Sequence, residues 1–206
     1  MEKHWWNSLY GILFGVYVPE ELRRLKGRVI LHISDTPFTF YGSVARLIRL
    51  LDPLWIIHTG DLADNVKLEI APWELPRYIH SVTQLSRILR GEKKRSLALV
   101  MGNHDHPATI RSLFPDSLLF EGKGRMKACG LDLNLSHDMP GFLTPFGRYN
   151  LFGHDPNVFD PPEGGSLFLN GIAAVNVIAA DTGRVYSLPY PEYVNDARLG
   201  RRKRGL

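Results

Sequence analysis

The chain of 206 residues contains a single cysteine, Cys129, and no long uninterrupted apolar segment. One cysteine excludes an intrachain disulfide framework and any zinc site built from several cysteines. The longest apolar run, residues 9–18, is about half as long as a helix that crosses a bilayer. This run is also a poor signal peptide, because it has neither a basic start nor a small-residue cleavage site. We therefore expect a cytoplasmic protein without a transmembrane segment.

The sequence has little net charge outside its C-terminus. The formal charge is +4, but residues 198–206 supply five of the 25 basic residues and no acidic residue. The rest of the chain holds 20 basic and 21 acidic residues. The basic tail can be a solvated terminus, or it can contact nucleic acid or anionic lipid.

No internal repeat or low-complexity linker divides the chain, and its length suits one domain. We expect an aromatic-rich N-terminal helical segment at residues 1–26, a domain at residues 27–197 and the basic tail at residues 198–206. The N-terminal segment can cover the domain, lie on a membrane interface or mediate a homodimer.

Three short apolar runs in the first half, residues 28–34, 54–59 and 97–101, predict buried strands. Helical periodicity at residues 43–51 and 73–90 predicts the helices between them. This alternation favours a parallel sheet with helices on its faces.

The second half contains six shorter strand-like runs separated by turn residues, which favours a more antiparallel sheet. The sequence Asp181-Thr182-Gly183 predicts a hairpin between the last two runs. The six runs are residues 117–120, 126–135, 148–152, 166–169, 173–180 and 184–188.

Five polar clusters follow apolar runs directly. In open α/β sheets ligands bind beyond the carboxyl ends of the strands, so we expect these clusters to converge on one edge. Carboxylate and amide oxygens together with imidazoles suit Mn, Fe, Zn or Ni, and one Asp can bridge two metals. The clusters are Ser34-Asp35, Gly60-Asp61-Leu62-Ala63-Asp64-Asn65, Gly102-Asn103-His104-Asp105, Ser136-His137-Asp138 and Gly153-His154-Asp155.

The five clusters in this order resemble the calcineurin-like metallophosphoesterase family from about residue 29 to residue 186. The resemblance implies an α/β fold, a four-layer α/β/β/α sandwich with two central mixed sheets. It also implies a metal-dependent hydrolase of phosphate mono- or diesters. Asn65 and His106 stand where the large protein phosphatases carry Arg and Glu, which favours a phosphodiesterase or a small-molecule phosphatase.

The resemblance assigns each cluster a role. Asp61 matches the carboxylate that bridges two metal ions, and Asp35 matches a ligand of the first metal. The other ligands of the second metal match Asn103, His137 and His154. In the same comparison, the imidazole that assists ester cleavage and the carboxylate that orients it match His104 and Asp64, respectively.

The sequence departs from the family pattern at two positions, Pro37 and Pro156. The family has histidines there, both ligands of the first metal, and proline offers no lone pair. Three interpretations follow: a hydrolase with one firmly held metal, a hydrolase with a rebuilt first site, or an inactive scaffold or binding protein. The retained His104 and Asp64 favour a hydrolase.

A rebuilt first site would draw its ligands from nearby groups. Because Asp35 and Asp61 offer oxygen, Mn or Mg becomes more plausible there, and we expect Mn overall, as one or two ions. The candidate replacements are Asp155, Asp105, Asp138, His106, His32 and His58.

Several of these residues also have structural interpretations. His32 and His58 lie inside apolar runs and suit hydrogen bonding in the core, while His106 suits the start of a helix. Arg148 belongs to a loop at residues 139–149 that is rich in proline, glycine and aromatic residues. We expect this loop at the pocket mouth, where Arg148 can contact substrate; packing of its aromatic rings is the alternative.

Overall fold

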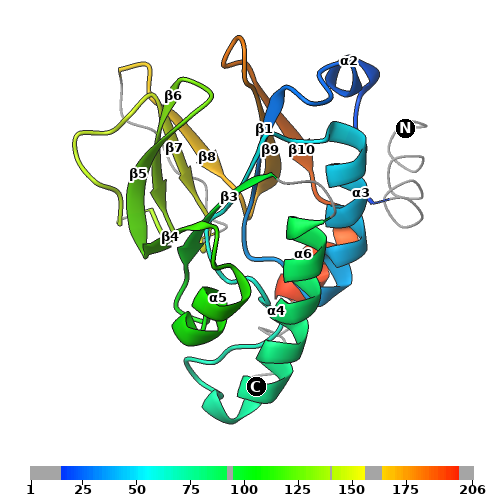
Figure 1. Cartoon of the computed structure of the whole chain (residues 1–206), viewed down its shortest axis with the longest axis vertical. Coiled ribbons are helices and arrows are strands. Elements are labelled where there is room, and N and C mark those ends of the chain that lie inside the picture. The colour runs from blue at the N-terminus through cyan, green and yellow to red at the C-terminus, as the bar shows by residue number, and fades with distance from the viewer. Residues whose placement is uncertain (1–14, 92–94, 140, 156–163, 200–206) are drawn as a thin grey trace.

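The computed structural model describes residues 15–91, 95–139, 141–155 and 164–199. Two β-sheets face each other, and helices cover one of them (Figure 1). The helices are α2 (Glu20–Arg23), η1 (Phe38–Phe40), α3 (Tyr41–Leu51), η2 (Pro72–Glu74), α4 (Leu75–Arg90), α5 (Pro107–Leu113) and α6 (Glu192–Leu199). The strands are β1 (Val29–Ile33), β2 (Trp55–His58), β3 (Ser96–Met101), β4 (Leu118–Glu121), β5 (Lys123–Ala128), β6 (Leu131–Ser136), β7 (Tyr149–Phe152), β8 (Leu167–Asn170), β9 (Ala174–Ala179) and β10 (Val185–Pro189).

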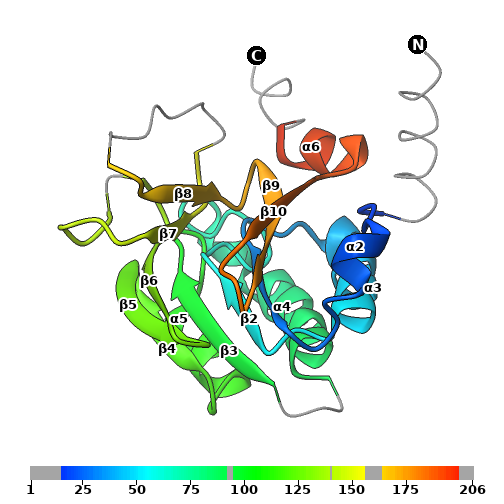
Figure 2. The ribbon, with the colours of Figure 1, turned by 90° about the horizontal axis from the view of Figure 1, so that it is seen from above.

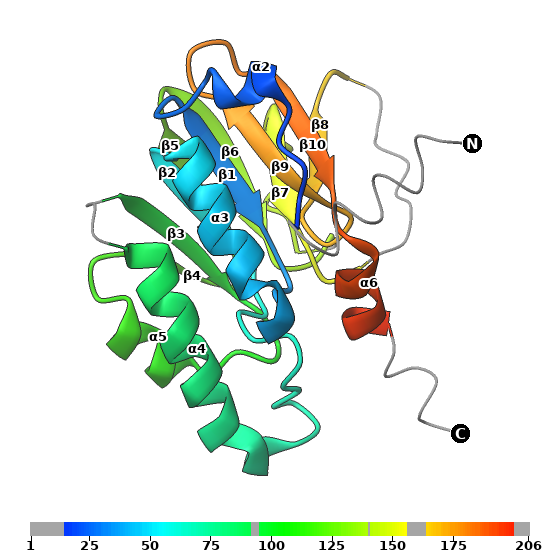
Figure 3. The ribbon, with the colours of Figure 1, turned by 90° about the vertical axis from the view of Figure 1, so that its right-hand side faces the viewer.

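The first sheet has six strands in the order β10-β9-β1-β2-β3-β4. Strands β1 to β4 are parallel, and β9 and β10 run antiparallel to their neighbours. Figure 3 shows α3 and α4 lying along one face of this sheet. The predicted parallel arrangement of the first half, its two long helices and the terminal hairpin are therefore present.

The second sheet has the order β5-β6-β7-β8 and lies on the side of the first sheet away from α3 and α4 (Figure 2). The prediction of antiparallel pairing holds for β5 with β6 but is wrong for β6 with β7 and β7 with β8, which are parallel. It is also wrong for β4, which joins the first sheet in parallel. The connections are long enough to return the chain to the same end of the sheet before each new strand.

The apolar run at residues 126–135 forms two strands and not one. Strands β5 and β6 meet at Cys129 and Gly130, whose φ angles are 51° and 79°. Two consecutive positive φ angles are typical of the tight turns that join antiparallel strands. The sequence signals this turn only weakly, because cysteine is not one of the residues that favour a positive φ angle.

Two apolar cores result from the alternation of side chains along the strands. Leu31 and Ile33 face the helices, where they pack with Val44 and Leu47 of α3. Ile30 points the other way, into a second core between the two sheets. Both faces of the first sheet are thus buried, as expected of a parallel sheet. The α/β class with two central mixed sheets is confirmed.

The loop between β6 and β7 covers the outer face of the second sheet. The ring of Phe142 contacts Phe152 edge to face, with centroids 5.7 Å apart. The ring of Phe146 contacts Phe168 in the same way, at 5.2 Å. In the part of this loop that the structure describes, the aromatic rings therefore pack on the second sheet. This agrees with the alternative prediction of ring packing and not with a loop at the pocket mouth.

Two predictions lie outside the described residues. The N-terminal aromatic segment falls mostly within residues 1–14, and the basic tail falls mostly within residues 200–206. Helix α2 begins directly after Pro19, where proline followed by two acidic residues predicts a helix start. Among the helices described, none combines the length and the apolar character that crossing a membrane requires.

His32 on β1 is buried between the sheets and is hydrogen-bonded on both ring nitrogens. Nδ1 lies 3.3 Å from the amide nitrogen of Asn176, and Nε2 lies 3.0 Å from the hydroxyl of Thr59. Burial lowers the pKa of His32 to about 3. The imidazole is therefore neutral in the folded protein at neutral pH.

This burial makes the free energy of unfolding depend on pH. Between about pH 6.5 and pH 3 the unfolded chain binds a proton at His32 and the folded chain does not, so stability falls as the pH falls through this range. We expect His32→Gln to reduce that slope by about 1.4 kcal/mol per pH unit. Urea unfolding of the metal-free protein at several pH values measures this dependence of stability on pH. His80→Gln, a substitution at an exposed position of α4, is the control. If His32→Gln and the wild type had the same dependence, the neutral state of buried His32 would be contradicted.

Candidate metal centre

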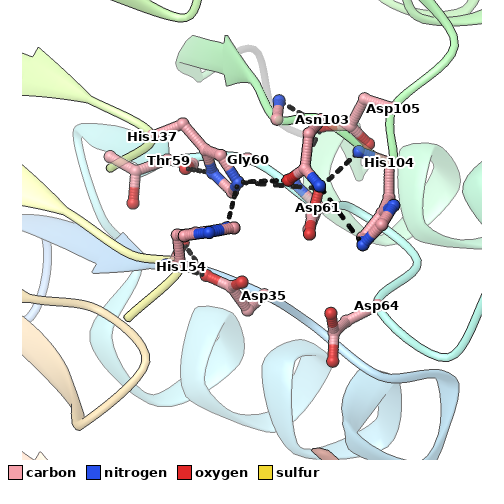
Figure 4. A network of polar contacts seen from close by, with 12 residues as sticks. Asp35, Thr59, Gly60, Asp61, Asp64, Asn103, His104, Asp105, His137 and His154 are labelled. Atoms are coloured by element: carbon pink, nitrogen blue, oxygen red, sulfur yellow. Dashed lines mark hydrogen bonds and ion pairs between the residues drawn. The ribbon is translucent and has the colours of Figure 1, made fainter. Parts of the chain in front are cut away.

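The carboxyl ends of strands from both sheets meet at one edge. Asp35 follows β1, Asp61 follows β2 and Asn103 follows β3, while His137 and His154 follow β6 and β7 of the second sheet. Figure 4 shows these side chains facing one another across the gap between the strand ends. The structure thus brings together the five polar clusters at a single site.

Four of these residues form what we call the donor cluster: Asp61, Asn103, His137 and His154. Nε2 of His137 lies 3.0 Å from Oδ1 of Asn103 and 3.1 Å from Nδ1 of His154. Oδ1 of Asp61 lies 3.8 Å from the same nitrogen. Four potential metal ligands therefore surround one point.

The protonation of His137 follows from its other nitrogen. Nδ1 lies 2.8 Å from the backbone carbonyl oxygen of Thr59, and a carbonyl can only accept, so Nδ1 carries the proton. In the neutral imidazole, Nε2 then presents a lone pair. The Asn103 amide nitrogen donates to Glu69, so its oxygen is the atom that faces His137. With this tautomer, the lone pair of Nε2 and the oxygen of Asn103 both face the same point, where a cation could bind both.

Three carboxylates form a second group, the acidic cluster: Asp35, Asp61 and Asp64. Their oxygens lie within 4.8 Å of one another, and all three residues are buried. Burial raises the pKa of Asp35 and of Asp61, and repulsion between the carboxylates raises both further. Lys67 pairs with Asp64, and its charge counteracts the rise at Asp61. The acidic cluster therefore requires positive charge to remain ionised.

The backbone at the site is held in an uncommon conformation. Asp35, Asp61 and His154 have φ angles of 47°, 55° and 63°, in the left-handed region. Such residues cost about 1–3 kcal/mol each and occur where side chains are aimed at a functional site. The glycine before Asp61 is required for space as well, because a Cβ on Gly60 would overlap the ring of His137.

Asp105 organises the loops that carry the ligands. Its carboxylate accepts hydrogen bonds from the backbone N–H groups of Asp61, Leu62 and Gly102 at 2.8, 2.9 and 2.9 Å. It also accepts from the hydroxyl of Tyr78 at 2.8 Å. Its oxygens are thus fully used, and they tie the loop after β2 to the loop after β3.

His104 lies at the rim of the site. Its backbone N–H donates to Oδ1 of Asp61 at 3.1 Å, which places the imidazole next to the donor cluster. Nδ1 lies 3.9 Å from a carboxylate oxygen of Glu69. Burial lowers the pKa of His104 to about 4; the charge of Lys67 also lowers it, and the charges of Glu69 and Asp64 raise it. Asp64 therefore acts on His104 through its charge and forms an ion pair with Lys67.

Other candidate ligands serve the local structure. His58 contacts the Thr36 hydroxyl through Nε2 at 2.8 Å. His106 caps α5, because its side chain accepts from the backbone N–H of Thr109. Asp138 accepts from the backbone N–H of Gly141 at 2.8 Å.

The remaining two candidates lie near the two opposite ends of β7. Arg148 immediately precedes this strand, whereas His154 follows it, so Arg148 lies at the end of the strand opposite the site. Asp155 lies next to His154, and its carbonyl oxygen accepts from the side chain of Asn170 at 2.7 Å. Pro156 is outside the described residues.

Sequence reasoning missed Lys67 and Glu69, which both reach the site. They follow the Gly60–Asn65 cluster by two and four residues, in a segment without apolar periodicity. Their closeness in sequence to that cluster is the one signal for a role at the site. Closeness in sequence does not predict the direction in which a side chain points.

Comparisons with known proteins agree with this geometry. The calcineurin-like phosphoesterase family matches residues 28–197. No curated protein matches the sequence. Among solved structures, Yfce, a phosphoesterase from E. coli, has 13% identity and a TM-score of 0.50, with 79% of this chain and 99% of that chain covered.

Two further solved structures are similar over most of their length. A protein of unknown function from Aquifex aeolicus has 16% identity and a TM-score of 0.41, covering 82% of this chain and 98% of that one. A nuclease from Pseudomonas putida has 19% identity and a TM-score of 0.40, covering 84% and 91%. The likeness to Yfce concerns the fold alone, and the family match spans most of the sequence. The chain belongs to the calcineurin-like phosphoesterase family.

Proposed function

We propose that the protein is a metal-dependent phosphoesterase that hydrolyses phosphate mono- or diesters. One divalent cation, Mn²⁺ by preference, would be held by the donor cluster. The observation that carries this proposal is the convergence of four donors: Nε2 of His137 lies 3.0 Å from Oδ1 of Asn103, 3.1 Å from Nδ1 of His154 and 3.8 Å from Oδ1 of Asp61. The mixed nitrogen and oxygen donors suit Mn²⁺ and similar transition metals. Such a cation supplies charge neutralisation at the phosphoryl group and Lewis-acid activation for attack on phosphorus.

The residues of the chain supply orientation and proton transfer. Asp61 is fixed from two sides, since its backbone N–H donates to Asp105 and its carboxylate accepts from the backbone of His104. We propose that the imidazole of His104 donates a proton or a hydrogen bond to the leaving alkoxide. Burial and the charge of Lys67 lower the pKa of His104 to about 4, and the negative charges of Glu69 and Asp64 counteract this, which supports an assisting role for Asp64.

The role of His104 predicts a leaving-group dependence. For a phosphate ester with a poor leaving group, such as an alkyl or nucleoside ester, we expect His104→Ala to lower kcat by about 10²-fold or more. For a p-nitrophenyl ester the loss should be much smaller, because that leaving group departs without a proton. Bound Mn²⁺ should stay unchanged, since His104 contributes no ligand to the donor cluster.

The controls separate this role from its alternatives. His80→Ala, on the exposed face of α4, should leave both rates unchanged. Loss of the metal in His104→Ala, or an equal loss of rate for both esters, would contradict proton donation by His104. If the wild-type protein binds Mn²⁺ and hydrolyses neither ester, the protein is an inactive member of the family that acts as a scaffold or binding protein.

A further inference from the structure

Lys67 places a positive charge beside two members of the acidic cluster, Asp61 and Asp64. Its ammonium forms an ion pair with Asp64 and lies 3.9 Å from Oδ2 of Asp61. The side chains of these two carboxylates are only 6% and 1% exposed, and that of Lys67 is 25% exposed. The lysine thus reaches from the rim into a buried group of acids.

The acidic cluster has no imidazole ligand among the residues that the structure describes. On the chain, Pro37 follows Asp35 by two residues and is buried, and its ring nitrogen has no lone pair to offer. The acidic cluster therefore contains only carboxylates, without imidazole. One of its members, Asp61, is shared with the donor cluster, so the two groups lie side by side.

We propose that the ammonium of Lys67 takes the place of a second metal ion beside Asp61 and Asp64, so that the site works with one divalent cation and one lysine. This inference rests on the proposed function, in which the donor cluster holds the single metal. Lysine suits the position because its ammonium offers three donors to carboxylate oxygens and needs no lone pairs from its surroundings. It also explains how the acidic cluster tolerates the loss of imidazole ligands.

Charge repulsion supports the same assignment. The ammonium of Lys67 lies beside Asp61 and Asp64. A second divalent cation at these two carboxylates would lie next to that ammonium. Like charges at such short distances repel strongly where water is excluded, because the effective dielectric constant is low there. Lys67 and a second metal are therefore mutually exclusive occupants.

The experiment counts Mn²⁺ ions bound to the full-length protein after removal of adventitious metal and titration with MnCl₂. We expect one ion for the wild type and two for Lys67→Met, which keeps the length of the side chain but removes its charge. Lys67→Arg should bind one ion. Lys127→Ala, which removes an exposed lysine paired with Asp132 on the second sheet, should also bind one. Circular dichroism and thermal melting establish that each variant is folded.

Two results would overturn the assignment of Lys67: two ions in the wild type, or one ion in a folded Lys67→Met protein. Both leave the proposed phosphoesterase function standing, because the donor cluster still holds metal. If no ion binds to the wild type, the metal-dependent function fails, and the role of Lys67 fails with it. Hydrolysis measured on the same samples distinguishes these cases.

Discussion

Replacing Asn103 by alanine is expected to abolish Mn²⁺ binding and phosphate-ester hydrolysis together. Oδ1 of Asn103 faces Nε2 of His137 at 3.0 Å, whereas the other oxygen of the donor cluster, Oδ1 of Asp61, lies 3.8 Å from that nitrogen. Removal of outer partners of metal ligands already weakens metal binding about 10–100-fold, so loss of a ligand should exceed this range. Because Asn103 is exposed and belongs to neither core, the fold should persist.

The measurement combines isothermal titration with Mn²⁺ and steady-state hydrolysis of a phosphate ester. Asn103→Asp keeps an oxygen at the same position, so it should retain metal and activity in part. Thermal melting of the metal-free proteins should give the same midpoint for Asn103→Ala and the wild type. Unchanged Mn²⁺ affinity in a folded Asn103→Ala protein would remove this residue from the ligand set.

Replacing Asp105 by alanine is expected to lower the free energy of unfolding by about 3–5 kcal/mol. The substitution leaves the backbone N–H groups of Asp61, Leu62 and Gly102 without their acceptor, and also frees the hydroxyl of Tyr78. Each buried donor without a partner costs about 1–3 kcal/mol, and water entering the new space recovers part of that cost.

Urea unfolding of the metal-free proteins measures this loss. Asp132→Ala is the matched control, because Asp132 is exposed and pairs with the exposed Lys127 on the second sheet; its effect should stay within about 0.5 kcal/mol. Activity of Asp105→Ala should fall as well, since the loops after β2 and β3 lose their common anchor. A loss of stability below about 1 kcal/mol would contradict the anchoring role.

Much of the first half of the fold could be predicted from local patterns. Strands β1, β2 and β3 are short apolar runs, and α3 and α4 have long stretches of helical periodicity. The ends of these strands carry the polar clusters, and the general rule for ligand sites in α/β sheets predicts where they meet. The convergence at this edge therefore depends on signals that are local in the sequence.

The rest depends on distant contacts. Strands β6, β7 and β8 pair in parallel because long connections carry the chain back, and a strand pattern does not encode that path. Side-chain direction is equally hidden: Asp105 was a candidate ligand, yet its oxygens bind backbone N–H groups. Lys67 had no signal beyond its proximity to the Gly60–Asn65 cluster, because the role of its ammonium depends on carboxylates that only the fold brings beside it.

The central claim is that one cation is held where the two sheets meet. Anomalous diffraction from crystals of the wild-type protein grown with MnCl₂ tests it most directly, by locating manganese in the electron density. We predict one strong peak at the donor cluster, in contact with Asn103, His137 and His154 and next to Asp61. We predict no peak near Lys67 in the acidic cluster. Absence of a peak at the donor cluster from well-diffracting crystals would contradict the claim.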